Sequence, residues 1–207
     1  MSEWPAALLS ASRLLEAINA AAFGLYRAGL RRSRRAGATV ISVGNLALGG
    51  AGKTPLVAAL AGELLRLGMR PAILTRGYGR RAQETVFTQG GAPSWEEVGD
   101  EPALLARLLP DVPLAVGADR WRGSELMLAQ RSVTHFILDD GFQHWRLERE
   151  LDIVVLDGAD PFSRRRPRRE GPGALRRAHA AVISNLPAPR IPVIVAEIRT
   201  RFPHLQV

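Results

Sequence analysis

The chain has 207 residues, of which 46% are hydrophobic and 23% charged, a balance that indicates a folded protein and excludes two large domains. Cysteine is absent, which excludes disulfides, thiolate nucleophiles and metal sites with cysteine ligands. The net charge of +8 favours an anionic partner, such as nucleic acid, a lipid surface or a phosphorylated metabolite.

The first predicted element is an amphipathic helix between Trp4 and Leu30, followed at once by the arginine-rich residues 31–35. Two interpretations are open. The helix could lie in a membrane interface with its arginines on anionic head groups. The pattern alone favours the other, an ordinary helix whose apolar stripe packs on the core. A transmembrane span is not expected, because no uninterrupted run of about 18 or more apolar residues exists.

Beyond residue 38, apolar strands alternate with amphipathic helices, which predicts an α/β fold with a mostly parallel sheet and helices on both faces. The segment 164–169, which contains five arginines, is predicted to be an exposed loop. Strands are predicted over residues 39–43, 71–75, 84–88, 112–116, 135–138, 151–156, 180–183 and 192–196, and helices over residues 54–67, 101–109 and 120–130.

Residues 47–54 form a phosphate-binding loop (P-loop) motif between a predicted strand and a predicted helix, with Ala47 in place of the usual first glycine. Such a loop turns backbone N–H groups toward a polyphosphate, which glycine permits, and the next helix directs its positive end at the phosphates. Lys53, the only lysine, would neutralise phosphate oxygens, and Thr54 would supply a hydroxyl to Mg²⁺. The motif therefore predicts ATP and Mg²⁺, with a nucleotide site made of Ala47, Leu48, Gly49, Gly50, Ala51, Gly52, Lys53 and Thr54.

Two consecutive carboxylates follow the predicted strand 135–138. Because P-loop proteins place an acidic residue at the end of a neighbouring strand to hold the metal, Asp139 and Asp140 are candidate metal ligands beside Thr54. The alternative is that either aspartate only caps a helix or shapes a turn.

Four segments of the chain belong together as a pattern: VGNLALGGAGKTP (43–55), LTRGYGR (74–80), VGDEPALLA (98–106) and ILDDGFQHWRLERELDIVVLD (137–157). They resemble the tetraacyldisaccharide 4'-kinases, which phosphorylate the 4' position of the lipid A precursor disaccharide at the cytoplasmic face of the inner membrane. The resemblance runs in order to about residue 185. It implies transfer of the γ-phosphate of ATP to the 4' hydroxyl of a tetraacyldisaccharide 1-phosphate.

The resemblance also implies roles for single residues. Asp100 is the catalytic carboxylate that accepts the proton of the sugar hydroxyl, with Lys53 on the phosphates, although Asp100 could equally cap the helix 101–109. Glu170 lies near the nucleotide. The lipid or phosphate site is lined by Arg76, Tyr78, Arg120 and His144, for which the alternatives are surface charge for the arginines and a packed aromatic for Tyr78.

On this basis, residues 1–36 are expected to form an interfacial helix and basic segment, and residues 37–207 the N-terminal lobe of the kinase. The expected partners are the lipid disaccharide and the membrane surface, with a peripheral location on the cytoplasmic face of the inner membrane. No protein partner is implied. Nucleic acid is not expected, because no recognition motif is present and only 6% of residues are aromatic.

Family members are longer, with a second lobe that carries a histidine in an Asp-His segment, the partner of the catalytic aspartate. In this chain only His179 and His204 follow His144, and neither follows an aspartate. The resemblance therefore predicts at most half of the catalytic pair within these 207 residues, and ATP binding with much reduced transfer. The alternative function is a P-loop module that binds nucleotide and membrane with little or no kinase activity.

Overall fold

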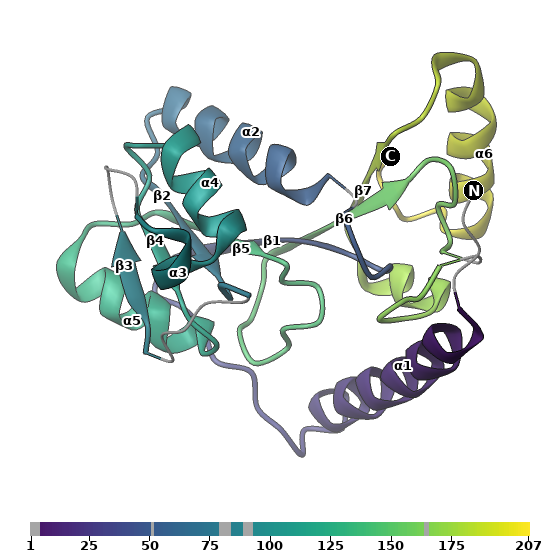
Figure 1. The fold of residues 1–207 in the computed structure, drawn as a ribbon, viewed down its shortest axis with the longest axis horizontal. Coiled ribbons are helices and arrows are strands. Elements are labelled where there is room, and N and C mark those ends of the chain that lie inside the picture. The colour runs from purple at the N-terminus through teal and green to yellow at the C-terminus, as the bar shows by residue number, and fades with distance from the viewer. Residues whose placement is uncertain (1–4, 51, 79–83, 89–92, 164–165) are drawn as a thin grey trace. The chain divides into compact units, whose positions relative to one another are not determined.

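The computed structural model describes residues 5–50, 52–78, 84–88, 93–163 and 166–207 (Figure 1). The chain divides into two compact units, each built from separate stretches of sequence. The first unit contains residues 1–32, 44–52 and 151–207, and the second contains residues 33–43 and 53–150. Ala51, predicted to bind nucleotide, lies outside the described residues, and the predicted boundary at residue 36 stays a prediction.

The second unit is built on strands in the order β3-β4-β2-β5-β1, parallel except for β3, which runs antiparallel to β4. The strand β5 lies between β1 and β2 and pairs with both, so that Ile137 lies beside Ile41 on one side and Ile73 on the other. The strands are β1 (Thr39–Asn45), β2 (Pro71–Thr75), β3 (Val86–Thr88), β4 (Leu114–Val116) and β5 (His135–Asp139).

Helices cover both faces of these strands. The helix α2 packs on β2 and β5, whereas α5 packs on β2 and β4, and the two helices lie on opposite faces (Figure 1). The core under α5 contains Met127 of that helix, packed with Leu74, Phe136 and Leu138 of the strands. The helices of this unit are α2 (Lys53–Arg66), α3 (Trp95–Val98), α4 (Asp100–Leu108) and α5 (Arg120–Gln130).

The first unit contains two parallel strands, in which Val155 of one pairs with Val182 of the other. Its elements are the helix α1 (Ala6–Arg27), the strands β6 (Leu151–Asp157) and β7 (Ala180–Ser184), the short 3₁₀ helices η1 (Pro172–Arg177) and η2 (Ala188–Arg190), and the helix α6 (Ile191–Arg201). The predicted α/β class, with a mostly parallel sheet and an N-terminal helix, is confirmed.

Two local predictions are wrong. The predicted strand 192–196 lies inside α6, where Pro192 occupies the first turn and Ile194 and Ile198 form a buried stripe four residues apart. Valine and isoleucine favour strands, but the burial of both isoleucines on one face stabilises a helix here.

The arginine-rich segment is not an exposed loop over residues 166–169, because Pro167 is buried and Arg168 forms an antiparallel bridge with Ala47.

The apolar stripe of α1 is exposed rather than packed on a core. The side of α1 that carries Leu14, Ile18 and Leu25 is open, with 64% of Leu14 and 56% of Ile18 accessible to solvent. This exposure is the opposite of what the core-packing interpretation predicted. By length and composition alone, the segment Leu8–Arg27 could also cross a membrane, a property that core helices and signal sequences share.

We expect Ile198→Ala to lower the free energy of unfolding by about 2–4 kcal/mol, because its side chain is fully buried on the inner face of α6. The control Val193→Ala removes an exposed side chain of the same helix and should change stability by less than about 0.5 kcal/mol. Chemical denaturation measures both variants. A larger loss for Val193→Ala than for Ile198→Ala would contradict the helix.

Candidate functional site

The glycine-rich loop follows β1 after a short connecting segment and belongs to the first unit. Gly49 has φ 104° and Gly52 has φ 79°, left-handed conformations that residues with a side chain rarely adopt. Asn45 donates a hydrogen bond from Nδ2 to the Gly49 carbonyl oxygen, 3.2 Å away, which ties the loop back to the strand end. A Cβ at Gly49 or Gly50 would meet no atom within 4 Å, so this part of the loop faces open space.

Lys53 is the first residue of α2 and opens the second unit. Its side chain is almost fully buried, and its Nζ lies 3.4 Å from Oδ1 of Asp140. Asp140 follows β5 directly and has φ 53°, and the next residue, Gly141, donates its N–H to the Val43 carbonyl oxygen of β1. The one lysine of the chain and the second aspartate of the predicted pair are therefore neighbours.

Asp139 ends β5 and is 1% exposed. The pKa of this carboxyl group is raised from its ordinary value of 3.8 to about 6, mainly by burial and to a smaller extent by the negative charges of Asp140 and Glu101. The hydroxyl of Thr75 opposes this rise by donating a hydrogen bond to Oδ2 over 3.0 Å, and Lys53 opposes it through its charge. Asp139 is thus a carboxylate whose negative charge is costly until a cation compensates it.

A magnesium ion fits this carboxylate. Within the described residues, Oδ1 of Asp139 is buried and makes no hydrogen bond, so one oxygen of the group is available to a metal-bound water or a metal. The described part of the chain holds no cluster of three or more acidic or histidine side chains. Mg²⁺ usually takes one or two carboxylates together with substrate phosphates. The predicted set Thr54, Asp139 and Asp140 is of this kind.

Asp100 is the first residue of α4, and its side chain is exposed. Gly99 occupies the N-cap position, and no side chain caps this helix, so Asp100 does not serve as the cap that one interpretation predicted. Gly99 has φ 93°, and a Cβ there would lie 2.8 Å from the carbonyl oxygen of Tyr78. This close approach of two backbone segments places Asp100 next to the turn that follows β2.

Two of the predicted substrate residues belong to that turn. Arg76 is exposed, and 88% of Tyr78 is accessible, so Tyr78 is not the packed aromatic of the alternative interpretation. The second unit therefore exposes Arg76, Tyr78 and Asp100 near the carboxyl end of β2.

The other two predicted substrate residues are largely buried. Arg120 begins α5, is 7% exposed and donates from Nη1 to the Ala118 carbonyl oxygen, so it is not a surface charge. Burial, together with the positive charges of Arg120 and Arg149, lowers the pKa of His144 from its ordinary value of 6.5 to about 3. His144 is therefore neutral at physiological pH, and its buried Nε2 makes no hydrogen bond to the described residues.

Glu170 belongs to the first unit and is also buried. It accepts a hydrogen bond from Arg177 over 2.6 Å, and its backbone N–H lies 3.5 Å from the carbonyl oxygen of Leu46, just ahead of the glycine-rich loop. Each unit therefore brings together its own part of the predicted site: the loop and Glu170 in the first, the lysine and the aspartates in the second.

Three polar residues near these groups were not among the predicted site residues. Thr75 and Asn45 are polar residues at the ends of apolar strands, a signal that could have identified them. Arg177, the partner of Glu170, lies in an arginine-rich stretch whose pattern carries no such signal.

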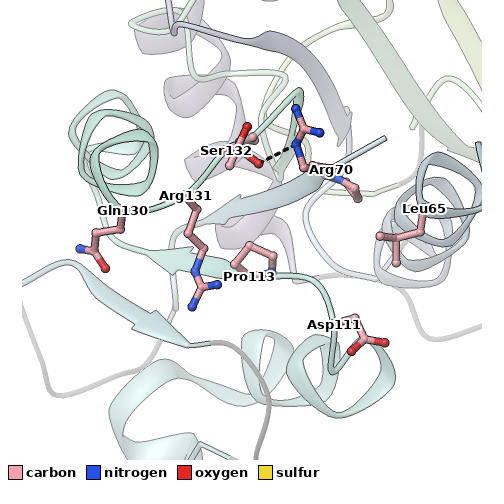
Figure 2. A pocket seen from close by; sticks show the side chains of 9 residues that line it. Leu65, Arg70, Asp111, Pro113, Gln130, Arg131 and Ser132 are labelled. Atoms are coloured by element: carbon pink, nitrogen blue, oxygen red, sulfur yellow. Dashed lines mark hydrogen bonds between the residues drawn. The ribbon is translucent and has the colours of Figure 1, made fainter. Parts of the chain in front are cut away.

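The second unit also has a cavity of about 330 Å³ at the opposite end of its strands (Figure 2). Pro71 begins β2 at this cavity, whereas Thr75 ends β2 beside Asp139. The side chains of Arg131 and Asp111 at its edge are exposed, and Arg70 donates from Nε to the Ser132 carbonyl oxygen. The cavity is therefore separate from the candidate site.

A strand, a glycine-rich loop, a lysine at the start of the next helix and an acidic end on the neighbouring strand define a P-loop α/β protein. The family model of the tetraacyldisaccharide-1-P 4'-kinases (LpxK) matches residues 4–207. This chain belongs to that family.

Individual relatives agree with the family model. Tetraacyldisaccharide 4'-kinase from Anaeromyxobacter dehalogenans (strain 2CP-C) is 45% identical over 188 residues, 87% of this chain and 50% of the relative. The enzyme of that name from Anaeromyxobacter sp. (strain Fw109-5) is 44% identical over 189 residues, 87% of this chain and 51% of the relative. The chain spans about half the length of these curated relatives.

A solved structure has the same fold. The crystal structure of the apo form of LpxK from Aquifex aeolicus in complex with ATP matches with a TM-score of 0.76 and 42% identity. The match covers 86% of this chain and 57% of that one.

We expect Asp139→Asn to stabilise the protein above pH 6. Because the folded state raises the pKa of Asp139 from 3.8 to about 6, the native protein holds more protons than the unfolded chain between these values. The free energy of unfolding therefore falls as pH rises through this window, and above pH 6 the whole cost is present. Removing the charge should raise the free energy of unfolding by about 2–3 kcal/mol at pH 7.5 and hardly change it near pH 4.

Denaturant unfolding at several pH values measures this difference, with the exposed Asp111→Asn as the control that should show none. A destabilised Asp139→Asn variant at pH 7.5 would contradict the buried, costly carboxylate.

Proposed function

We propose that this protein is an ATP-dependent kinase that transfers the γ-phosphate of ATP to the 4' hydroxyl of a tetraacyldisaccharide 1-phosphate in lipid A biosynthesis. The observation that carries the proposal is the group formed by buried Lys53 at the start of α2 with buried Asp139 and the partly buried Asp140 at the end of β5. It occurs in a chain of the tetraacyldisaccharide 4'-kinase family. The relative of known structure binds ATP.

The first half of the reaction is to bind the nucleotide. The backbone N–H groups of residues 49–52 would bind the phosphates, and Lys53 would exchange its contact with Asp140 for the β and γ oxygens. Glu170, anchored by Arg177, would lie toward the nucleotide from the first unit. Mg²⁺, held by Thr54, Asp139 and Asp140, would supply positive charge to the phosphates when bound.

The second half is to activate the acceptor. Asp100 is exposed at the first residue of α4, so its carboxylate is open to a substrate and would accept the proton of the sugar hydroxyl. Tyr78 and Arg76, on the adjoining turn, would contact the disaccharide and its phosphate. Neutral His144 and buried Arg120 would bind polar groups of the same substrate.

The substrate is a lipid, and α1 fits a membrane surface. Its exposed apolar side and the arginines after it would lie in the interface of a bilayer with anionic head groups. We infer that the protein works on the cytoplasmic face of the inner membrane as a peripheral protein.

The test of the kinase proposal separates nucleotide binding from transfer. Lys53→Ala should raise the Kd for ATP at least about tenfold, because no other lysine exists to replace the charge. Asp100→Asn should keep the Kd and lower the transfer rate by about 10²–10⁴-fold. Binding is measured by calorimetry, and transfer by labelled phosphate on the disaccharide lipid.

Arg66→Ala, at the far end of α2, is the control for lost positive charge in this test. A native affinity in Lys53→Ala would contradict the nucleotide site. ATP binding by the unaltered chain without any phosphate transfer would instead favour the nucleotide- and membrane-binding module.

Replacing Leu14, Ile18 and Leu25 together by glutamine should reduce binding to vesicles with anionic lipids at least about tenfold, because the variant loses the apolar area that α1 would insert. The matched control replaces three exposed apolar residues outside α1, at positions 67, 108 and 193, and should bind as the unaltered chain does. Vesicle sedimentation measures both. Equal binding of the two variants would contradict the interfacial helix.

A further inference from the structure

The backbone ahead of the glycine-rich loop is held by a second segment of the first unit. We call residues 46–48 the P-loop arm and residues 167–170 the clamp segment. Leu48 of the arm donates its N–H to the Pro167 carbonyl oxygen over 2.8 Å, and Arg169 of the clamp donates to the Leu46 carbonyl oxygen over 2.7 Å. Between these bonds, Ala47 and Arg168 form an antiparallel bridge. The arm therefore has the clamp segment as its backbone partner.

The helix α1 holds the clamp segment by two side chains. Glu16 accepts a hydrogen bond on Oε1 from Nε of Arg168 over 2.7 Å, and the two side chains are only 19% and 28% exposed. One turn further along α1, Asn19 donates from Nδ2 to the Arg169 carbonyl oxygen over 2.8 Å. These contacts fix the side chain of one clamp residue and the main chain of the next.

The contacts use one stripe of α1, opposite its exposed apolar side. Ser12, which is buried, Glu16, Asn19 and Phe23 follow one another at intervals of three or four residues, so they share a helix face. The guanidinium carbon of Arg177 lies over the ring of Phe23, 5.0 Å from the ring centroid. Arg177 also forms an ion pair with Glu170 at the end of the clamp segment. This face of α1 therefore contacts the clamp segment through Glu16 and Asn19, and Arg177 through Phe23.

Position matters at the arm because the glycine-rich loop begins where the arm ends. Backbone N–H groups stabilise phosphate oxygens only when they point at the ligand with little freedom, and a displacement of about 1 Å is costly. Within this unit the ion pair of Glu16 and Arg168 joins α1 to the clamp, and the clamp joins the arm through main-chain bonds.

We propose that Glu16 and Arg168 are positioning residues for the nucleotide site, which hold the P-loop arm in its phosphate-binding geometry by tying the clamp segment to α1. The inference rests on the proposed ATP binding. Neither residue needs to touch the nucleotide. If the ion pair were only structural, breaking it would lower the stability of the protein and leave the ATP affinity of the folded chain unchanged. Measuring both ATP affinity and stability therefore distinguishes a positioning role from a structural one.

The test uses the full chain and calorimetric titration with ATP and Mg²⁺. Glu16→Gln and Arg168→Gln should each raise the Kd for ATP by about threefold to tenfold. Each variant weakens the charge-assisted bond between α1 and the clamp segment, so the P-loop arm is held less firmly in its phosphate-binding geometry. The charge-swapped double variant, Glu16→Arg with Arg168→Glu, restores an ion pair and should return the Kd to within about twofold of the unaltered chain.

Glu197→Gln is the matched control. It breaks an ion pair with Arg201 in α6 of the same unit and should leave the Kd unchanged. Thermal unfolding of every variant shows which chains are folded. Single variants with the unaltered Kd, or a folded double variant whose Kd stays raised, would overturn the inference.

If a single variant does not fold, the double variant tests the positioning role. A Kd close to that of the unaltered chain supports the role of the Glu16–Arg168 ion pair, and a raised Kd overturns it. Failure of the unaltered chain to bind ATP would contradict the proposed function instead.

Discussion

The constraint on which the rest depends is the burial of the Asp139 carboxylate at the end of the central strand β5. Parallel pairing of β5 with β1 and β2 brings the carboxyl ends of these strands to one edge, where Thr75 and Lys53 meet the carboxylate and its neighbour Asp140. The free protein carries this charge at a cost, which a bound cation would remove. This cost supports the proposal that the second unit contributes ligands to a bound cation.

In the first unit the central feature is the backbone that leads into the glycine-rich loop. Glycines at positions 49 and 52 allow left-handed turns but give the loop no rigidity of its own. Rigidity comes from the P-loop arm, the clamp segment and α1, a chain of main-chain bonds that ends in the ion pair of Glu16 and Arg168. The same helix exposes apolar residues on its other side, so docking and the proposed membrane contact use different faces of α1.

The sequence predicts the features that depend on local pattern. The β-branched run at 39–43 and the apolar run at 135–138 are strands, and the spacing of glycine, lysine and threonine identifies the loop between strand and helix. Features set by long-range contacts were missed or wrong. The clamp segment contains two arginines, yet it pairs with the arm and binds α1. Residues 192–196 are helical because Ile194 and Ile198 are buried together. The burial of Arg120 and the exposure of Tyr78 likewise follow from packing that no pattern in the sequence encodes.

The most direct measurement of the central claim is proton release when the full chain binds ATP supplied as its magnesium complex. Calorimetry in buffers with different ionisation enthalpies gives the number of protons released. Because the folded protein raises the pKa of Asp139 to about 6, we expect release of about half a proton at pH 6 and none at pH 8. Binding at pH 6 without proton release would show that the buried carboxylate does not meet the cation, and would contradict the nucleotide site derived from it.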